Sequence, residues 1–80
     1  MEVIIVGHAR QKMGQYEVSE LQVIEALAKP DSILEGKYGR RIAQKRLNGL
    51  LLRVVYESHE EWKVVVTVYK AKAGRYEVRI

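Results

Sequence analysis

The sequence predicts a small α+β domain in which two N-terminal helices pack on one face of a twisted, mainly antiparallel sheet of three to five strands. Residues 40–70 contain two strands around an Asn48-Gly49 turn, followed by a third strand. The segment before them has helical periodicity. The 80 residues suffice for one domain, 1–80, and are too few for two.

The composition is that of a globular protein without cysteine. Hydrophobic residues make up 48% and charged residues 30%, a balance that supports a packed core. The apolar runs are far shorter than the ~20 residues that a membrane-spanning helix needs. Met1-Glu2 leads directly into an apolar segment without a basic leader, so we expect a cytoplasmic protein with no membrane partner. Disulfides and cysteine-ligated zinc are excluded.

The N-terminal segment predicts a strand and then a short helix. Residues 2–6 are β-branched and almost continuously apolar, which is typical of a strand covered on at least one face. Ala9, Met13 and Tyr16 then recur at the spacing of one helical stripe. His8 and Lys12 lie on a neighbouring stripe of the same predicted helix.

A second helix and a short strand are predicted before the hairpin. Ser19 and Gln22 have capping-box spacing, and Pro30 ends the helix near Lys29. The residues expected to form its buried face are Leu21, Ile24, Leu27 and Ala28. Residues 32–35 follow as a candidate strand, and residues 36–39 as a turn.

Asn48-Gly49 is the strongest local signal, because a type I′ turn needs positive φ at both central residues. A two-residue turn fixes the register of the strands that flank it. The pairs expected on one face are Leu47 with Leu50, Lys45 with Leu52, Ala43 with Val54 and Arg41 with Tyr56; those on the other are Arg46 with Leu51, Gln44 with Arg53, Ile42 with Val55 and Arg40 with Glu57. The first face is mostly apolar and should meet the helices.

The third strand, residues 62–70, alternates regularly, and its register depends on the loop at 58–61. An odd loop length would place Val64, Val66 and Val68 against the apolar face, whereas a four-residue loop would send them to the charged face. We expect the odd length. The open face would then display a basic patch with one aromatic, made of Arg40, Gln44, Arg46, Arg53, Lys63, Thr67 and Tyr69.

The last residues, 71–80, end in strict alternation of apolar and polar side chains. This pattern fits an edge strand of the same sheet. It fits equally an interaction tail that adds residues 75–80 to a partner's sheet, including that of a second copy in a homodimer.

The net charge of +4 and the pI near 9.5 favour an acidic partner, either RNA or an acidic protein. The glycines do not form a phosphate-binding loop of the P-loop type, so nucleotide hydrolysis has no support.

The order of several short motifs resembles a known family. The motifs are H-A-R-Q-K-M at 8–13, V-S at 18–19, Pro30-Asp31, L-L-R-V-V-Y at 51–56 and V-V-T-V-Y-K at 65–70. They resemble a family of short prokaryotic proteins of unknown function that open with an H-A-x-x-(R/K)-M helix and are related to the RelE/BrnT-like toxin superfamily. The resemblance covers about residues 3–70, and Tyr16 stands where the family often has an arginine.

This resemblance implies an endoribonuclease of a toxin–antitoxin system, with its site on the open sheet face and a small antitoxin-like protein as partner. The reaction would be attack of a ribose 2′-hydroxyl on the adjacent phosphate, which needs no metal or other cofactor. Three residues are the candidate catalytic groups: His8, Arg53 and Tyr69. Four further cations are candidate RNA ligands: Lys12, Arg40, Arg46 and Lys63.

Each assignment has a structural alternative. His8 could cap a helix, and the arginines could form the solvated face of an ordinary antiparallel sheet. His59 beside Glu60 and Glu61 fits a solvated loop better than a metal site, because no second ligand cluster accompanies it. The competing function is therefore a non-catalytic module of the same fold that binds RNA or an acidic protein.

Overall fold

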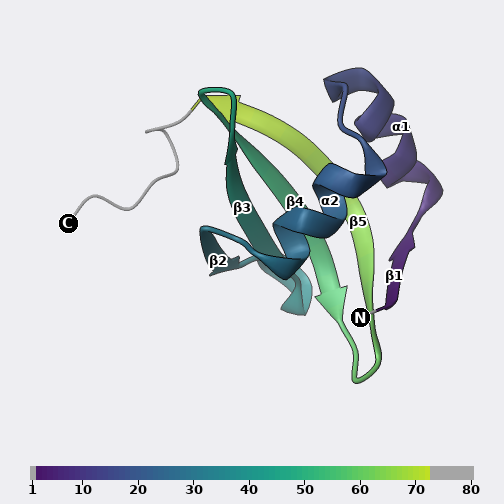
Figure 1. Ribbon diagram of the computed structural model, residues 1–80. Coiled ribbons are helices and arrows are strands. Elements are labelled where there is room, and N and C mark those ends of the chain that lie inside the picture. The colour runs from purple at the N-terminus through teal and green to yellow at the C-terminus, as the bar shows by residue number, and fades with distance from the viewer. Residues whose placement is uncertain (1, 73–80) are drawn as a thin grey trace.

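The computed structural model describes residues 2–72. The elements are β1 (Glu2–Ile5), α1 (Gly7–Tyr16), α2 (Glu20–Ala28), β2 (Ser32–Glu35), a 3₁₀ turn (Lys37–Gly39), β3 (Arg41–Leu47), β4 (Leu50–Ser58) and β5 (Trp62–Lys72). The strands form one sheet in the order β1-β5-β4-β3-β2, in which only the β1–β5 pair is parallel (Figure 1). The α+β class is therefore confirmed, with a five-stranded mixed sheet. Residues 71–72 of the predicted edge strand or tail continue β5, and the rest of that segment, including 75–80, lies outside the described residues.

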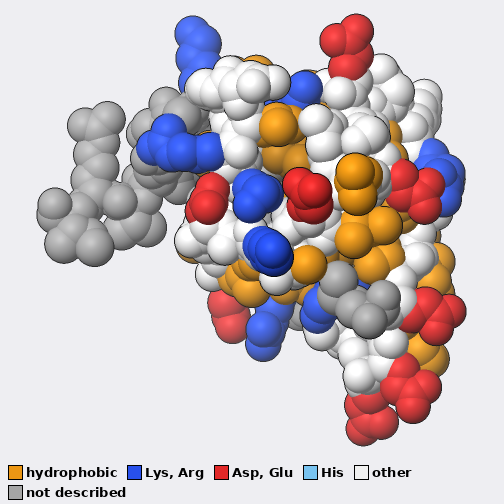
Figure 2. Space-filling model, viewed as in Figure 1, with side chains coloured by type: hydrophobic (Ala, Val, Ile, Leu, Met, Phe, Trp, Pro, Cys, Tyr) orange, Lys and Arg blue, Asp and Glu red, His pale blue; other side chains and the backbone are white. Residues whose placement is uncertain are grey.

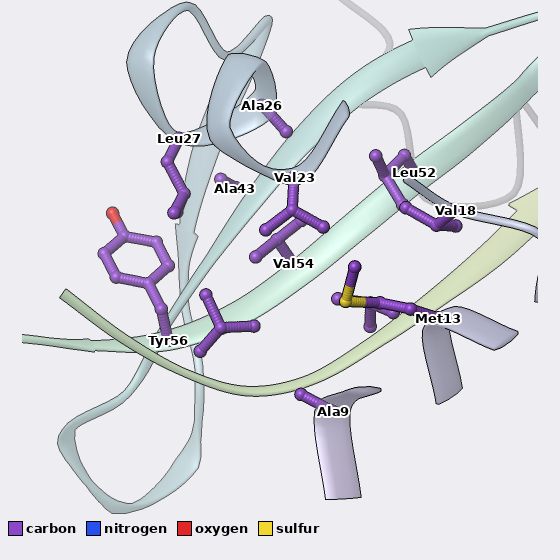
Figure 3. Close-up of a cluster of buried hydrophobic side chains, with 12 residues drawn as sticks. Ala9, Met13, Val18, Val23, Ala26, Leu27, Ala43, Leu52, Val54 and Tyr56 are labelled. Atoms are coloured by element: carbon purple, nitrogen blue, oxygen red, sulfur yellow. The ribbon is translucent and has the colours of Figure 1, made fainter. Parts of the chain in front are cut away.

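Both helices pack against the same face of the sheet. Ala9 and Met13 of α1 and Val23 and Leu27 of α2 point toward the sheet and enter one buried cluster (Figure 3). The sheet contributes side chains from its three central strands: Ala43, Leu52, Val54, Tyr56, Val65 and Val68. We call this side the helix-bearing face and the reverse the helix-free face, since neither α1 nor α2 covers it (Figure 1). No helix within residues 2–72 is long and apolar enough to cross a membrane.

The local signals for α2 are confirmed, but its buried face was wrongly predicted. Ser19 and Gln22 form both hydrogen bonds of the capping box. The buried residues are Val23, Ala26 and Leu27, whereas Leu21 is 65% exposed. This helix is apolar on most of its sides, so helical spacing admits more than one buried stripe. The approach of the sheet decides which stripe is covered.

The turns on either side of β3 both use left-handed backbone. Asn48 and Gly49 have φ of 52° and 81°, and seven of the eight predicted pairs, from Arg41–Tyr56 to Leu47–Leu50, are paired positions of β3 and β4. In the preceding turn Tyr38 and Gly39 have φ of 59° and 72°. A left-handed conformation costs a non-glycine residue roughly 1–2 kcal/mol. The exposed Tyr38 side chain has no buried contact that offsets this cost.

The register of β5 differs from the prediction because a β-bulge interrupts it. Next to the loop, Tyr56 pairs with Val65 and Ser58 with Lys63, so four residues, 59–62, lie between the last paired positions. Beyond the bulge, Val55 pairs with Thr67, and Val66 is the extra residue of β5. Without a bulge, this loop would have placed Val64, Val66 and Val68 on the face opposite the core. The extra residue shifts the alternation of β5 by one position, so that Val68 lies on the core face. Val68 is buried as predicted. Next to the loop, however, the buried residue of β5 is Val65, whereas Val64 and Val66 were expected to be buried.

The pairing next to the loop places Lys63 on the helix-bearing face, which contradicts its predicted position in the basic patch. Lys63 pairs with Ser58, and its Nζ lies 3.3 Å from Ser58 Oγ and 5.2 Å from the centre of the Tyr56 ring. Tyr56 belongs to the core. On the helix-bearing side, acidic and basic side chains are interspersed (Figure 2). A single-sign patch is therefore not visible on that side.

Candidate functional site

A polar row crosses the helix-free face at right angles to the strands. The register places Ser32, Gln44, Arg53 and Tyr69 side by side on β2, β3, β4 and β5. Gln44 Nε2 donates to Ser32 Oγ at 3.0 Å, and the Arg53 guanidinium carbon lies 5.4 Å from the centre of the Tyr69 ring. We call these four residues the central row. Rows of mainly apolar side chains flank it, including Ile42 with Val55 and Leu51 with Ala71.

The central row is much less exposed than predicted. Gln44 is 3% and Arg53 5% exposed, whereas the sequence predicted that both would be displayed in a basic patch. A guanidinium so deeply buried is poorly placed to bind a phosphate in solution. Its contact with the face of Tyr69 is instead a cation–π interaction, which holds the half-buried ring in place. Arg53 is therefore better interpreted as a positioning residue for Tyr69.

Two other arginines of the predicted patch remain accessible. Arg46 is exposed on the same face as Arg53, and the Arg46 backbone N–H donates to Asp31 Oδ2 at 2.7 Å. Arg40 is partly exposed at the opposite end of β3. The prediction that Arg46 and Arg53 share one face is confirmed by the β3–β4 register.

His8 and Lys12 are not on this face. Both belong to α1, which packs on the helix-bearing face through Ala9 and Met13. Arg53 and Tyr69 alternate with core residues of β4 and β5 and therefore point to the reverse of the sheet. The sheet separates the His8 imidazole from both of them, so the predicted catalytic trio is not assembled.

A second group of side chains lies where β4 turns into β5, and we call Arg40, Glu57, His59 and Trp62 the hairpin-end cluster. Arg40 Nε lies 3.2 Å from Glu57 Oε2, and His59 Nε2 lies 3.7 Å from Glu57 Oε1. The ring centroids of His59 and Trp62 are 5.7 Å apart, and the two ring planes are inclined at 31°. All four side chains are partly exposed. These contacts link an imidazole, a carboxylate and a guanidinium on an accessible surface.

His59 and Trp62 were not among the predicted site residues: His59 was expected in a solvated loop, and Trp62 only as the first residue of the third strand. One signal was available: the hairpin register had already paired Arg40 with Glu57, two residues before His59. What the sequence could not show is the turn that brings the rings together. The backbone N–H of His59 donates to the backbone carbonyl of Trp62 at 2.9 Å and closes the loop.

A family model described as Domain of unknown function (DUF4258) matches residues 5–70. The chain belongs to this family. The match extends from β1 into β5 and so includes both the central row and the hairpin-end cluster. Searches of curated proteins and of solved structures found no match. Because this family's description names no activity, the functional argument rests on the geometry of the two groups.

Proposed function

We propose that this DUF4258 domain is a toxin-type endoribonuclease with a RelE-like architecture, which binds RNA on the helix-free face. The supporting observation is the placement of accessible Arg46 and Arg40 on that face, with the Tyr69 ring in a row between them. The two arginines are six positions apart along an extended chain, which corresponds to roughly 20 Å. A single strand of RNA could therefore contact both.

Each accessible residue suits one part of an RNA strand. The planar guanidinium groups of Arg46 and Arg40 can each bind a phosphate through two hydrogen bonds. Tyr69 can stack on a base, a contact that accepts any base because each has a π face. Arg53, behind the Tyr69 ring, keeps the ring in position for stacking. The net charge of +4 adds a general attraction for RNA.

Cleavage would follow from in-line attack of a ribose 2′-hydroxyl on the neighbouring phosphate. This reaction needs a proton acceptor and a cation near the phosphate oxygens. An antitoxin-like partner would inhibit it by covering the same face. Apolar side chains such as Ile42 and Val55 beside accessible arginines suit an acidic partner with some apolar residues.

RNA binding tests this proposal most simply. Arg46→Ala and Tyr69→Leu are each expected to weaken the binding of a labelled single-stranded RNA by about 1–3 kcal/mol, as measured by fluorescence anisotropy. Arg10→Ala is the matched control, because Arg10 is an exposed arginine on α1 that pairs with Glu20. The affinity of the unaltered protein should fall steeply with salt. Equal losses for Arg10→Ala and Arg46→Ala would contradict binding on the helix-free face.

A non-catalytic module of the same fold is the second candidate. It is favoured by the burial of Arg53 and by the separation of His8 from Tyr69. In that case RNA or an acidic protein binds the same face and stays intact. Incubation of labelled RNA with the purified protein in EDTA distinguishes the two, because the proposed nuclease releases fragments and the binding module does not.

A further inference from the structure

The hairpin-end cluster holds an imidazole in contact with a carboxylate and an indole ring. Glu57 lies beside His59 Nε2, and the carboxylate of Glu57 is itself held by Arg40. Trp62 lies against the imidazole ring, while the loop backbone is closed by the His59–Trp62 hydrogen bond. A solvated loop histidine needs none of these contacts.

We propose that His59 is the proton acceptor of RNA cleavage and that Glu57 orients it, which places the reaction at the hairpin end of the helix-free face. This inference rests on the RNA-cleaving function proposed above. It assigns a catalytic role to His59, a positioning role to Glu57 and a phosphate-binding role to Arg40. His8, which the sequence favoured, has no role in the reaction.

The position of Glu57 determines which imidazole nitrogen is available. A carboxylate beside Nε2 favours the tautomer that carries its proton on Nε2, because that N–H can donate to the carboxylate oxygen. Nδ1 is then the free acceptor. The present Nε2–Oε1 separation of 3.7 Å is longer than a hydrogen bond, and such contacts commonly shorten when substrate binds.

A small pocket beside His59 can hold one nucleobase. Its volume is about 250 Å³, below the roughly 300–1,000 Å³ of sites for larger ligands. The residues that line it are His59, Glu60, Glu61, Trp62 and Lys63. The indole of Trp62 offers a stacking surface, and the two carboxylates accept hydrogen bonds from exocyclic amino groups. Lys63 can donate to a carbonyl of the same base. The substrate that we expect is therefore single-stranded RNA with an amino-bearing base, in preference to uracil, in this pocket.

The phosphate would lie on the Arg40 side of the cluster, away from Glu60 and Glu61. The 2′-hydroxyl proton moves to His59 Nδ1 as the 2′ oxygen forms a bond to phosphorus. The bond from phosphorus to the 5′ oxygen of the next nucleotide breaks, and that oxygen takes up a proton from water or from the imidazolium. The products are a 2′,3′-cyclic phosphate and a 5′-hydroxyl end.

Tyr69 is too far away to act on the same phosphate. Its partner Arg53 is four residues from Glu57 along β4, a separation of roughly 13 Å. Tyr69 therefore stacks on a base elsewhere along the strand, as proposed above. The two aromatic contacts bind different nucleotides of the same RNA.

The test compares His59→Gln with His8→Gln, the same substitution on the helix-bearing side. We expect His59→Gln to slow cleavage of a labelled mixed-sequence RNA by about 10²–10⁴-fold, far more than it weakens RNA binding. His8→Gln should cleave at the unaltered rate. Far-UV circular dichroism of each variant checks that it is folded.

Two further measurements separate catalysis from a structural role. The cleavage rate should fall on acidification, because a protonated imidazole cannot accept a proton, and His59→Gln should remove that dependence. The charged groups around His59 are Glu57, which contacts it, Arg40, which contacts Glu57, the pocket residues Glu60, Glu61 and Lys63, and Glu2 of β1, which pairs with Trp62. Glu57→Gln should lower the rate less than His59→Gln does. Oligouridine should be cleaved more slowly than the mixed-sequence RNA.

The outcomes distinguish this inference from the proposed function. If the unaltered protein cleaves RNA and His59→Gln cleaves equally fast, the role of His59 is wrong and the nuclease stands. If His8→Gln alone abolishes cleavage, the reaction lies on the helix-bearing side. If the unaltered protein binds RNA without cutting it, both the nuclease and the role of His59 are overturned.

Discussion

Replacing Leu52 with alanine is expected to lower the free energy of unfolding by about 2–5 kcal/mol. Leu52 is only 1% exposed and lies in the core between β4 and the helices. Truncation removes buried methyl groups and leaves a cavity that a close-packed core fills only in part. Since small domains are stable by about 5–15 kcal/mol, the variant should be marginally folded. Urea denaturation followed by circular dichroism measures the change.

Leu21→Ala is the matched control for this prediction. Leu21 is the same residue type but is 65% exposed on α2, so its truncation should change stability by no more than about 0.5 kcal/mol. From the sequence, Leu21 was expected on the buried face of this helix. Equal destabilisation by the two variants would restore that prediction and contradict the observed position of α2.

Val65→Asp should destabilise the protein by about 3 kcal/mol or more, because it places an unpaired carboxylate in the core. Val65 is fully buried, and its neighbour Val66 is the partly exposed extra residue of the bulge. Val66→Asp should therefore cost much less. Thermal unfolding of the two variants side by side measures the difference.

The reverse order would show that β5 has no bulge. A regular ladder with the predicted odd loop would bury Val66 and expose Val65. In that register Lys63 would lie on the helix-free face and Val64 on the helix-bearing face, the reverse of their observed positions.

The parts of the fold that follow local rules could be predicted from the sequence. Asn48-Gly49 tolerates the positive φ that a two-residue hairpin needs, and period-two alternation then fixes every pair between β3 and β4. The capping box at Ser19 depends on residues three apart and was equally readable. Such signals need no knowledge of distant contacts.

The bulge could not be predicted, because an unpaired residue leaves no pattern in an apolar run such as Val64–Val65–Val66. Its consequences reach the candidate site, since the extra residue returns Val68 to the core face and Tyr69 to the helix-free face. The burial of Arg53 also escaped prediction, because alternation assigns a residue to a face but does not report how crowded that face is. Among the candidate site residues, Arg40, Arg46 and Tyr69 share the predicted face.

The hairpin-end cluster depends on contacts between neighbouring strands that a linear pattern only partly encodes. The Arg40–Glu57 pair follows from the predicted register. The approach of His59 to Glu57 and Trp62 depends on the pairing of Ser58 with Lys63 beside the loop, a register that was predicted incorrectly. The β3–β4 register, which was predicted correctly, therefore gave the Arg40–Glu57 pair, and the β4–β5 register, which was not, concealed the contacts of His59.

The most direct test of the account is an NMR titration of the ¹⁵N-labelled protein with a single-stranded RNA whose 2′-hydroxyls are methylated, so that it cannot be cleaved. We expect the largest amide shift changes at Arg40, Arg46 and Tyr69 and in the loop at 59–62, with little change along α1 and α2. Shift changes concentrated on the helices, or none at concentrations that saturate an ordinary RNA-binding domain, would contradict RNA binding on the helix-free face.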